Sequence, residues 1–268
     1  MQPWNIAHRG GAALSPENTL TAVGRAQRLG ADGAEIDVQL SADGRVVVYH
    51  DYRLNPGYTR LRDGDWLDGV TPRIKDLTWE QLQRYNIGLP KPGSDYARAH
   101  PLLRDADGET IPTLEALAGI AKIVPGFRLL IELKCGASED SADPHLLSNA
   151  AYDVVAAAGF LPRAIFVGFD WRALVPLVAR GAACWFTTDR LQGDARPVID
   201  GIAQCGAEGW FPNFLDAIPE NVAYARSRGL KVGAWTVNDP VDMKRLQALD
   251  IICTDRPDIM AASQGVKT

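Results

Sequence analysis

Several features that define common functional classes are missing from this sequence of 268 residues. The four cysteines (Cys135, Cys184, Cys205 and Cys253) form no CxxC pair, which argues against a thiolate zinc site and against a disulfide framework. The sequence has no run of 18 apolar residues and no basic leader before an apolar segment. We therefore expect no integral membrane segment and a cytoplasmic protein.

An excess of positive charge is also missing. The formal net charge is −5, so we expect no nucleic-acid partner, although a local basic pocket for a small anion stays compatible with this balance. Neither a GxGxxG motif nor a P-loop is present. The composition does offer 46% apolar residues, which is enough for a sizeable core.

Apolar runs alternate with stretches of helical spacing along most of the chain. From Leu129 onward the expected strands lie in "RLLIELK", "AIFVGFD", "ACWFTTD", "EGWFPN", "KVGAWTVN" and "DIICTDRP", with helices between most of them, for example over 146–159 and 221–229. The N-terminal part adds the strands "WNIAHRG" and "AEIDVQL" around a helix expected from Ser15 to Leu29. Such alternation predicts parallel strands joined by crossover helices.

The number of strands and the length of the chain favour one (β/α)₈ (TIM) barrel over two domains. We count nine strand-like segments against the eight of the barrel, because Asp43-Gly44 predicts a hairpin after the second strand. One strand of that hairpin should therefore be extra or distorted. Residues 52–110 are rich in Gly, Pro, Asp and Arg with one helical patch, "LTWEQLQRYNIG", so we expect an insertion within a single domain spanning 1–268. Thr113 should cap the helix that follows.

Acidic residues and a histidine cluster on the expected hairpin. A two-residue loop at Asp43-Gly44 would pair Asp37 with His50, and Glu35 would point to the same face. A three-residue loop would send His50 to the other face. Glu132 follows on a later strand with Lys134 on its side. Adjacent carboxylates repel unless a cation binds them, and oxygen ligands favour Mg²⁺ or Ca²⁺. Ordinary strand-end ion pairs are the alternative.

The first strand ends in His8-Arg9, which would lie at the catalytic rim of a barrel. Arginine offers a fork of donors suited to phosphate, and histidine can exchange a proton near neutral pH. A satisfied core histidine is the alternative for His8 alone. Trp235 either packs or forms a pocket wall, and we expect Asp189, Asp239 and Asp255 to cap helices or turns.

Taken in order, "AHRGGAALSPENT", "GADGAEIDVQLSADGRVVVYHD", "IPTLEAL", "LLIELK", "WTVN" and "CTDRP" resemble the glycerophosphodiester phosphodiesterase family over nearly the whole chain. The resemblance implies a distorted TIM barrel of the phospholipase C-like phosphodiesterase type, with the insertion after the HD motif. It implies that Glu35, Asp37 and Glu132 hold one divalent cation and that His8 and His50 are the general acid and base. It also implies that Arg9 binds phosphate, with Lys134 nearby for substrate charge.

We therefore expect metal-dependent hydrolysis of glycerophosphodiesters, such as glycerophosphocholine and glycerophosphoethanolamine, to sn-glycerol 3-phosphate and an alcohol. The nucleophile is water or the glycerol 2-hydroxyl. Lysophospholipids or glycerophosphoinositol are alternative substrates, and a non-catalytic barrel that binds phosphorylated ligands is an alternative of another class. "YRLNPGYTR" replaces the Arg-Thr-Thr often found after the HD motif in this family. The expected partner is a small-molecule substrate, and a homodimer is left open.

Overall fold

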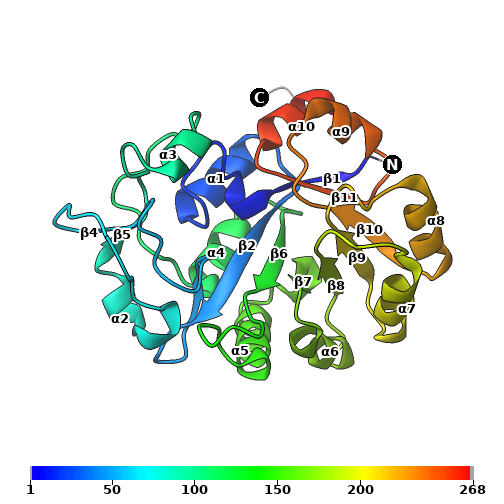
Figure 1. Cartoon of the computed structure of the whole chain (residues 1–268), viewed down its shortest axis with the longest axis horizontal. Coiled ribbons are helices and arrows are strands. Elements are labelled where there is room, and N and C mark those ends of the chain that lie inside the picture. The colour runs from blue at the N-terminus through cyan, green and yellow to red at the C-terminus, as the bar shows by residue number, and fades with distance from the viewer. Residues whose placement is uncertain (1, 266–268) are drawn as a thin grey trace.

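Eight parallel strands close into a barrel in the computed structural model, which describes residues 2–265 (Figure 1). Each strand pairs with its neighbour in the order β1-β11-β10-β9-β8-β7-β6-β2, and the barrel closes where Ile6 and Ala7 of β1 pair with Gly33 and Ala34 of β2. The barrel strands are β1 (Trp4–Ala7), β2 (Gly33–Leu40), β6 (Arg128–Leu133), β7 (Ala164–Gly168), β8 (Cys184–Thr188), β9 (Gly209–Pro212), β10 (Lys231–Ala234) and β11 (Ile251–Thr254). The predicted barrel is confirmed.

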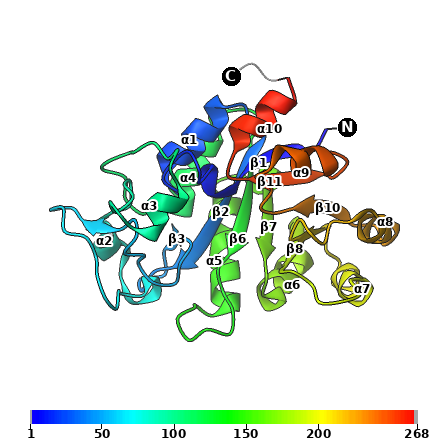
Figure 2. The same cartoon turned by 45° about the horizontal axis from the view of Figure 1, so that its top comes forward.

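Helices surround the barrel on its outer face (Figures 1 and 2). They are α1 (Leu20–Arg28), α4 (Leu114–Ala121), α5 (Pro144–Ala157), α6 (Trp171–Ala179), α7 (Arg196–Gln204), α8 (Pro219–Ser227), α9 (Pro240–Arg245) and α10 (Pro257–Ser263), with short 3₁₀ segments η1 (His8–Gly10) and η3 (Leu161–Arg163). None of the helices within residues 2–265 combines the length and the apolar character that crossing a membrane requires.

The apolar strands are buried on both faces. Alternate side chains of each strand point into the barrel or toward the helices, so both sets must be apolar. On β6, Leu130 belongs to the inner cluster with Trp185 and Phe211, while Leu129 and Ile131 belong to the larger cluster beneath the helices. This double burial explains why the sequence shows near-continuous apolar runs rather than alternation.

The ninth strand, β3 (Val46–Val48), is antiparallel to β2 and lies outside the barrel ring. The predicted register of this hairpin is wrong by one residue. Leu40 pairs with Val46, and the amide of Ser41 donates to the carbonyl of Arg45, so the loop has three residues and ends at Gly44 with φ of 77°. A left-handed glycine at the third loop position is a standard three-residue hairpin, and it competes with the two-residue turn that Asp-Gly favours.

The segment between β3 and α4 holds a small core of its own. It contains β4 (Arg60–Leu61), η2 (Ile74–Asp76), α2 (Trp79–Leu82), β5 (Tyr85–Asn86) and α3 (Asp95–Ala99). Its buried cluster includes Tyr49, Leu54, Tyr58, Ile74 and Ile87. The expected helical patch is present as α2, which begins with a capping box between Thr78 and Gln81, whereas α3 was not expected. The segment lies beside the barrel near α1 and α4 (Figure 1).

The first helix begins later than expected. Thr19, not Ser15, caps α1, and Asn18 adopts a left-handed conformation with φ of 59°. Residues 15–18 therefore form a turn rather than the first turn of a helix. The reason is that Glu17 binds Arg9 and Asn18 binds Asp37 through their side chains. A helix that began at Ser15 would point these two side chains in other directions. Thr113 caps α4 and Asp239 caps α9, as predicted.

Candidate active site at the carboxyl end of the barrel

Three carboxylates meet where β2 and β6 lie side by side. Asp37 pairs in register with Glu132, and Glu35 lies two residues before Asp37 on the same face. Each of the three residues offers an oxygen, and these oxygens all lie within 4.8 Å of one another. Glu35 and Asp37 are buried, with 2% and 1% of their surfaces exposed. The structure thus brings together the three acids that the sequence singled out.

The two buried acids are in opposite electrostatic situations. Burial, together with the neighbouring charges of Asp37 and Glu132, raises the pKa of Glu35 well above its usual range. Burial acts in the same direction on Asp37, but Arg9, His50 and Lys134 outweigh it and hold the pKa of Asp37 below its usual range. Nearby cations thus balance the negative charge of Asp37 but not that of Glu35.

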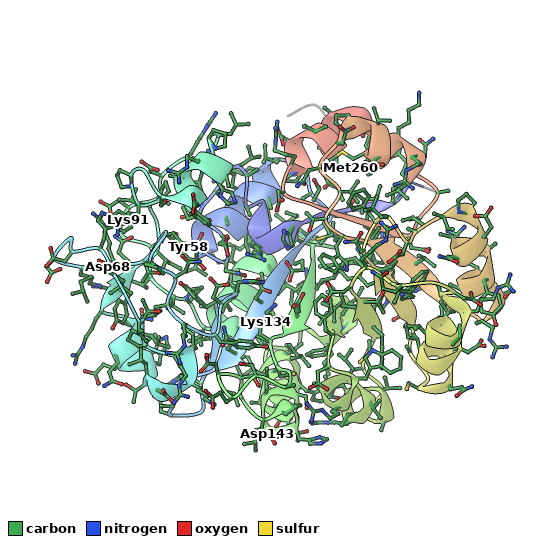
Figure 3. The ribbon with its side chains drawn as sticks, viewed as in Figure 1. Tyr58, Asp68, Lys91, Lys134, Asp143 and Met260 are labelled. Atoms are coloured by element: carbon green, nitrogen blue, oxygen red, sulfur yellow. The ribbon has the colours of Figure 1, made fainter. Side chains whose placement is uncertain are left out.

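Lys134 directly follows β6 (Figure 3) and neutralises part of the negative charge of the cluster. Its Nζ lies 2.8 Å from Glu132 Oε1 and 3.7 Å from Asp37 Oδ1. Burial lowers the pKa of Lys134, but the two carboxylates raise it by more, so the ammonium stays charged. Lysine at this position supplies a fixed cation beside the acids.

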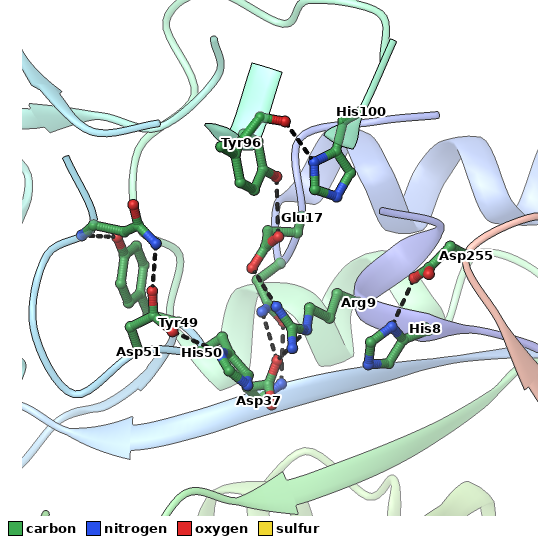
Figure 4. A network of polar contacts seen from close by, with 12 residues as sticks. His8, Arg9, Glu17, Asp37, Tyr49, His50, Asp51, Tyr96, His100 and Asp255 are labelled. Carbon is green, nitrogen blue, oxygen red and sulfur yellow. Dashed lines mark hydrogen bonds and ion pairs between the residues drawn. The ribbon is translucent and has the colours of Figure 1, made fainter. Parts of the chain in front are cut away.

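His8 lies in η1 directly after β1, with its Nδ1 bound to Asp255 (Figure 4). The distance from Nδ1 to Asp255 Oδ1 is 2.7 Å, and Asn238 Nδ2 donates to the other oxygen at 2.7 Å. Because an ionised carboxylate only accepts hydrogen bonds, Nδ1 of His8 carries the hydrogen. The other ring nitrogen, Nε2, faces the acidic cluster and lies 3.9 Å from Glu35 Oε2. The expectation that Asp255 caps a helix or turn is wrong, because its carboxylate bonds to the side chains of His8 and Asn238 and Arg256 occupies the N-cap of α10.

His50 reaches the cluster by a different route from the one predicted. The observed register places the Tyr49 amide, which donates to Asp37 O at 2.9 Å, opposite Asp37. The strand ends at Val48, however, and the bend that follows brings the His50 ring beside Asp37 (Figure 4). Gln39 Nε2 holds this bend by donating to the carbonyls of Tyr49 and Asp51 at 2.8 Å each.

A second aspartate binds His50. His50 Nδ1 lies 2.6 Å from Asp51 Oδ1, and Asn55 Nδ2 donates to Asp51 Oδ2 at 2.6 Å. Although burial opposes ionisation, these bonds and the His50 charge hold the pKa of Asp51 below its usual value. Both histidines are thus flanked by an aspartate that an asparagine holds in place.

Arg9 is surrounded by carboxylates. Its backbone is left-handed, with φ of 50°, and its amide donates to Glu35 Oε2 at 3.0 Å. Its Nη1 donates to Glu17 at 2.8 Å, and its Nε lies 3.4 Å from Asp37 Oδ2. The turn that carries it packs closely on α1, because a Cβ at Gly10 would lie 2.6 Å from the Cβ of Ala22. Gly10 therefore serves helix packing.

Trp235 follows β10 and lies partly buried on the inner barrel cluster. Its ring packs edge-on against Phe169 with centroids 5.4 Å apart, and its Nε1 donates to the carbonyl of Phe211 at 3.1 Å. Phe169 follows β7, so the aromatic pair joins two loops at the carboxyl rim. Trp235 therefore packs on the barrel core and also borders the barrel mouth.

Sequence reasoning missed several residues of the site, namely Glu17, Asn18, Gln39, Asp51, Asp255 and Asn238. Asn18 Nδ2 donates to Asp37 Oδ2 at 2.8 Å and its Oδ1 accepts the Asp37 amide at 3.1 Å. Asp255 could have been found from barrel closure, since β11 pairs with β1 and Thr254 lies opposite Ala7. Gln39 gave no signal because its role depends on where the hairpin ends.

The donors present fit a hard divalent cation. Glu35 Oε1 is buried and has no hydrogen-bond partner within residues 2–265, although burying such an oxygen unpaired is costly. The surrounding donors are carboxylate oxygens, the ligands that Mg²⁺ and Ca²⁺ prefer. A cation here would also relieve the repulsion that raises the pKa of Glu35.

Comparisons with known proteins agree with this geometry. The model of the glycerophosphoryl diester phosphodiesterase family matches residues 8–259. A glycerophosphodiester phosphodiesterase from Caldanaerobacter subterraneus subsp. tengcongensis is 30% identical over 269 residues, covering 95% of each chain. The crystal structure of a putative glycerophosphoryl diester phosphodiesterase from Silicibacter pomeroyi is 29% identical, with a TM-score of 0.87, over 98% of this chain and 94% of that one.

A phosphodiesterase from Oleispira antarctica, solved in complex with its product sn-glycerol 3-phosphate, shares the fold with a TM-score of 0.76 and 24% identity, over 98% of this chain and 97% of that one. The match of the family model and the full-length relatives confirm the predicted resemblance. The chain belongs to the glycerophosphoryl diester phosphodiesterase family and is an enzyme of that activity.

Proposed function

We propose that this chain hydrolyses glycerophosphodiesters such as glycerophosphocholine and glycerophosphoethanolamine to sn-glycerol 3-phosphate and an alcohol, using one divalent cation and the pair His8 and His50. One observation carries the proposal. Two imidazoles flank a cluster of three carboxylates, and each has an aspartate on its Nδ1, at 2.7 and 2.6 Å. A protein that only binds phosphorylated ligands has no need of two oriented proton-transfer groups.

Glu35, Asp37 and Glu132 would hold the cation, which is Mg²⁺ or Ca²⁺ by the chemistry of its ligands. When bound, it supplies positive charge for the phosphoryl oxygens. Lys134 stays beside Glu132 and adds a second, fixed positive charge. The cluster therefore suits a substrate that carries a phosphodiester anion.

The histidines move the protons of the reaction. One Nε2 accepts the proton of the attacking hydroxyl, and the other donates a proton to the oxygen of the departing alcohol. Asp255 and Asp51 keep the hydrogen on Nδ1, so that Nε2 of each ring is the reacting nitrogen. They also stabilise the imidazolium form that each ring takes in turn.

Arg9 and Trp235 bind the substrate in this proposal. The Arg9 guanidinium lies between Glu17 and Asp37, and no hydrogen bond from its Nη2 occurs within residues 2–265, so this nitrogen is available to a phosphoryl oxygen. Trp235 and Phe169, which follow β10 and β7, form an apolar wall at another part of the rim, which suits the alcohol portion.

The test is the release of sn-glycerol 3-phosphate from glycerophosphocholine by His8→Ala and His50→Ala. Each variant is expected to lose between about 10² and 10⁴ in kcat, the usual contribution of a general acid or base. His145→Ala, in the first turn of α5, is the matched control. Turnover within a few-fold of wild type in either site variant would contradict the proposed mechanism.

A further inference from the structure

A chain of polar contacts connects the insertion to Arg9. The Tyr96 hydroxyl, on α3, donates to Glu17 Oε2 at 2.9 Å, and Glu17 Oε1 accepts from Arg9 Nη1 at 2.8 Å (Figure 4). Glu17 is 4% exposed, so these two donors replace the water that its carboxylate would otherwise bind. Tyr96 lies 79 positions after Glu17 in the sequence, so these contacts join two distant segments of the protein.

Two other rings pack against the ring of Tyr96. Its centroid lies 4.6 Å from that of Tyr58 and 4.2 Å from that of His100, which stacks on it. His100 Nδ1 also bonds to the carbonyl of Tyr96 at 2.8 Å. The hydroxyl therefore has little freedom to follow Glu17 if the carboxylate moves, and the insertion fixes where Glu17 can lie.

We propose that Tyr96 is a positioning residue for the phosphate site, acting through Glu17 on the guanidinium of Arg9. This inference rests on the proposed function, in which Arg9 binds the phosphoryl group. The insertion is then part of the substrate-binding machinery and more than a cover over one end of the barrel.

The direction of the effect follows from the charges around Arg9. Without the Tyr96 hydroxyl, Glu17 Oε2 is left unpaired in a buried position, and Glu17 gives up its place. Arg9 Nη1 then loses its acceptor, while Asp37 Oδ2 already lies 3.4 Å from Nε. The guanidinium turns toward the acids of the cluster and away from the phosphoryl group, so affinity for a phosphate monoester falls.

The experiment measures the inhibition constant of sn-glycerol 3-phosphate, kcat and Tm for Tyr96→Phe. We expect that constant to rise about tenfold, as for the loss of a hydrogen bond to a charged group, with kcat within about threefold. Glu17→Gln should give the same rise and add nothing to Tyr96→Phe. Tyr58→Phe is the matched control, because its hydroxyl is buried in the same stack with no hydrogen-bond partner within residues 2–265.

Arg9→Lys, which keeps the charge and loses the fork, separates the possible outcomes. If Arg9→Lys raises the inhibition constant and Tyr96→Phe adds less than about twofold on that background, the inference holds. An unchanged constant in both Tyr96→Phe and Glu17→Gln, with only Tm lowered, overturns it while the proposed function stands. An equal effect of Tyr96→Phe with and without Arg9→Lys also overturns it. No effect of Arg9→Lys itself would instead contradict the proposed role of Arg9.

Discussion

Replacing Asp255 with asparagine tests the paired arrangement of histidine and aspartate most sharply. Asp255→Asn keeps the size of the side chain, and its amide oxygen can still accept the hydrogen bond from Asn238. The substitution removes the negative charge that lies 2.7 Å from Nδ1 of His8. Burial opposes the ionisation of Asp255, but the bond from His8 and its charge hold the pKa of this carboxyl below its usual value. The aspartate is therefore ionised when the imidazolium forms.

The structure sets the size of the expected loss. A hydrogen bond to a charged group contributes about 1.5–3 kcal/mol, and solvent screening favours the lower part of this range because His8 and Asp255 are 19% and 22% exposed. At 1.36 kcal/mol for each tenfold change, kcat should fall about tenfold to thirtyfold. KM should change by less than about threefold, because within residues 2–265 the side chain of Asp255 bonds to His8 and Asn238 and not to Arg9 or Lys134, the proposed substrate-binding residues.

The assay is the steady-state release of sn-glycerol 3-phosphate from glycerophosphocholine at saturating Mg²⁺, across a range of pH. Asp200→Asn is the control, since Asp200 accepts from Tyr224 on the outer helices at 3.0 Å, far from the carboxylate cluster in sequence and in the fold. If Asp255→Asn keeps kcat within twofold of wild type while His8→Ala is strongly impaired, the claim that Asp255 orients and stabilises His8 is refuted.

Three further predictions concern the cluster, the pH dependence and the thiols. Glu35→Gln should weaken Mg²⁺ binding in calorimetry and raise Tm in EDTA, because glutamine replaces a carboxyl group whose ionisation is opposed by burial and by two neighbouring acids. The pKa of Asp51 and of Asp255 is lowered in the folded state, so their contribution to the free energy of unfolding is present above about pH 4 and lost as pH falls through the folded values. A variant with both aspartates changed to asparagine should therefore lose less Tm than wild type between pH 5 and pH 3; an equal loss contradicts the assignment. Burial raises the pKa of Cys135 and of Cys184 to about 12 and that of Cys253 well above its usual value, so a thiol reagent at pH 8 should modify Cys205 first, as peptide mapping would show.

The barrel could be predicted because its signal is repeated along the chain. Each parallel strand is buried on both faces, so every strand appears as an apolar run. The count of nine runs predicted an extra or distorted strand in the hairpin, and the structure shows that this strand is β3. The three acids could be predicted for a related reason. They lie at alternate positions or in register on neighbouring strands, so alternation alone places them together.

The position of His50 was predicted from an incorrect pairing. Asp43-Gly44 favours a two-residue turn, whereas the hairpin has a three-residue loop with Gly44 left-handed. His50 lies beside Asp37 nonetheless, because the strand ends at Val48 and Gln39 fixes the bend after it. Local sequence contains no information on a hydrogen bond formed by a side chain 10 residues away.

The turn at Ser15–Thr19 shows the same limit. Ser-Pro-Glu has the residues of a helix start, yet the helix begins at Leu20. Glu17 and Asn18 are bound by Arg9, Tyr96 and Asp37, which come from three other segments of the chain. Propensity is a weak preference, and these buried polar contacts outweigh it.

The central claim is that a divalent cation on Glu35, Asp37 and Glu132 works with His8 and His50 to cleave a glycerophosphodiester. The most direct measurement is release of sn-glycerol 3-phosphate from glycerophosphocholine by chelator-treated protein, before and after addition of Mg²⁺ or Ca²⁺, with Glu132→Gln alongside. We predict loss of turnover in EDTA, recovery with one of the two ions, and a higher ion concentration for half-maximal activity in Glu132→Gln. Full turnover in EDTA, or no turnover with either ion, would contradict the account.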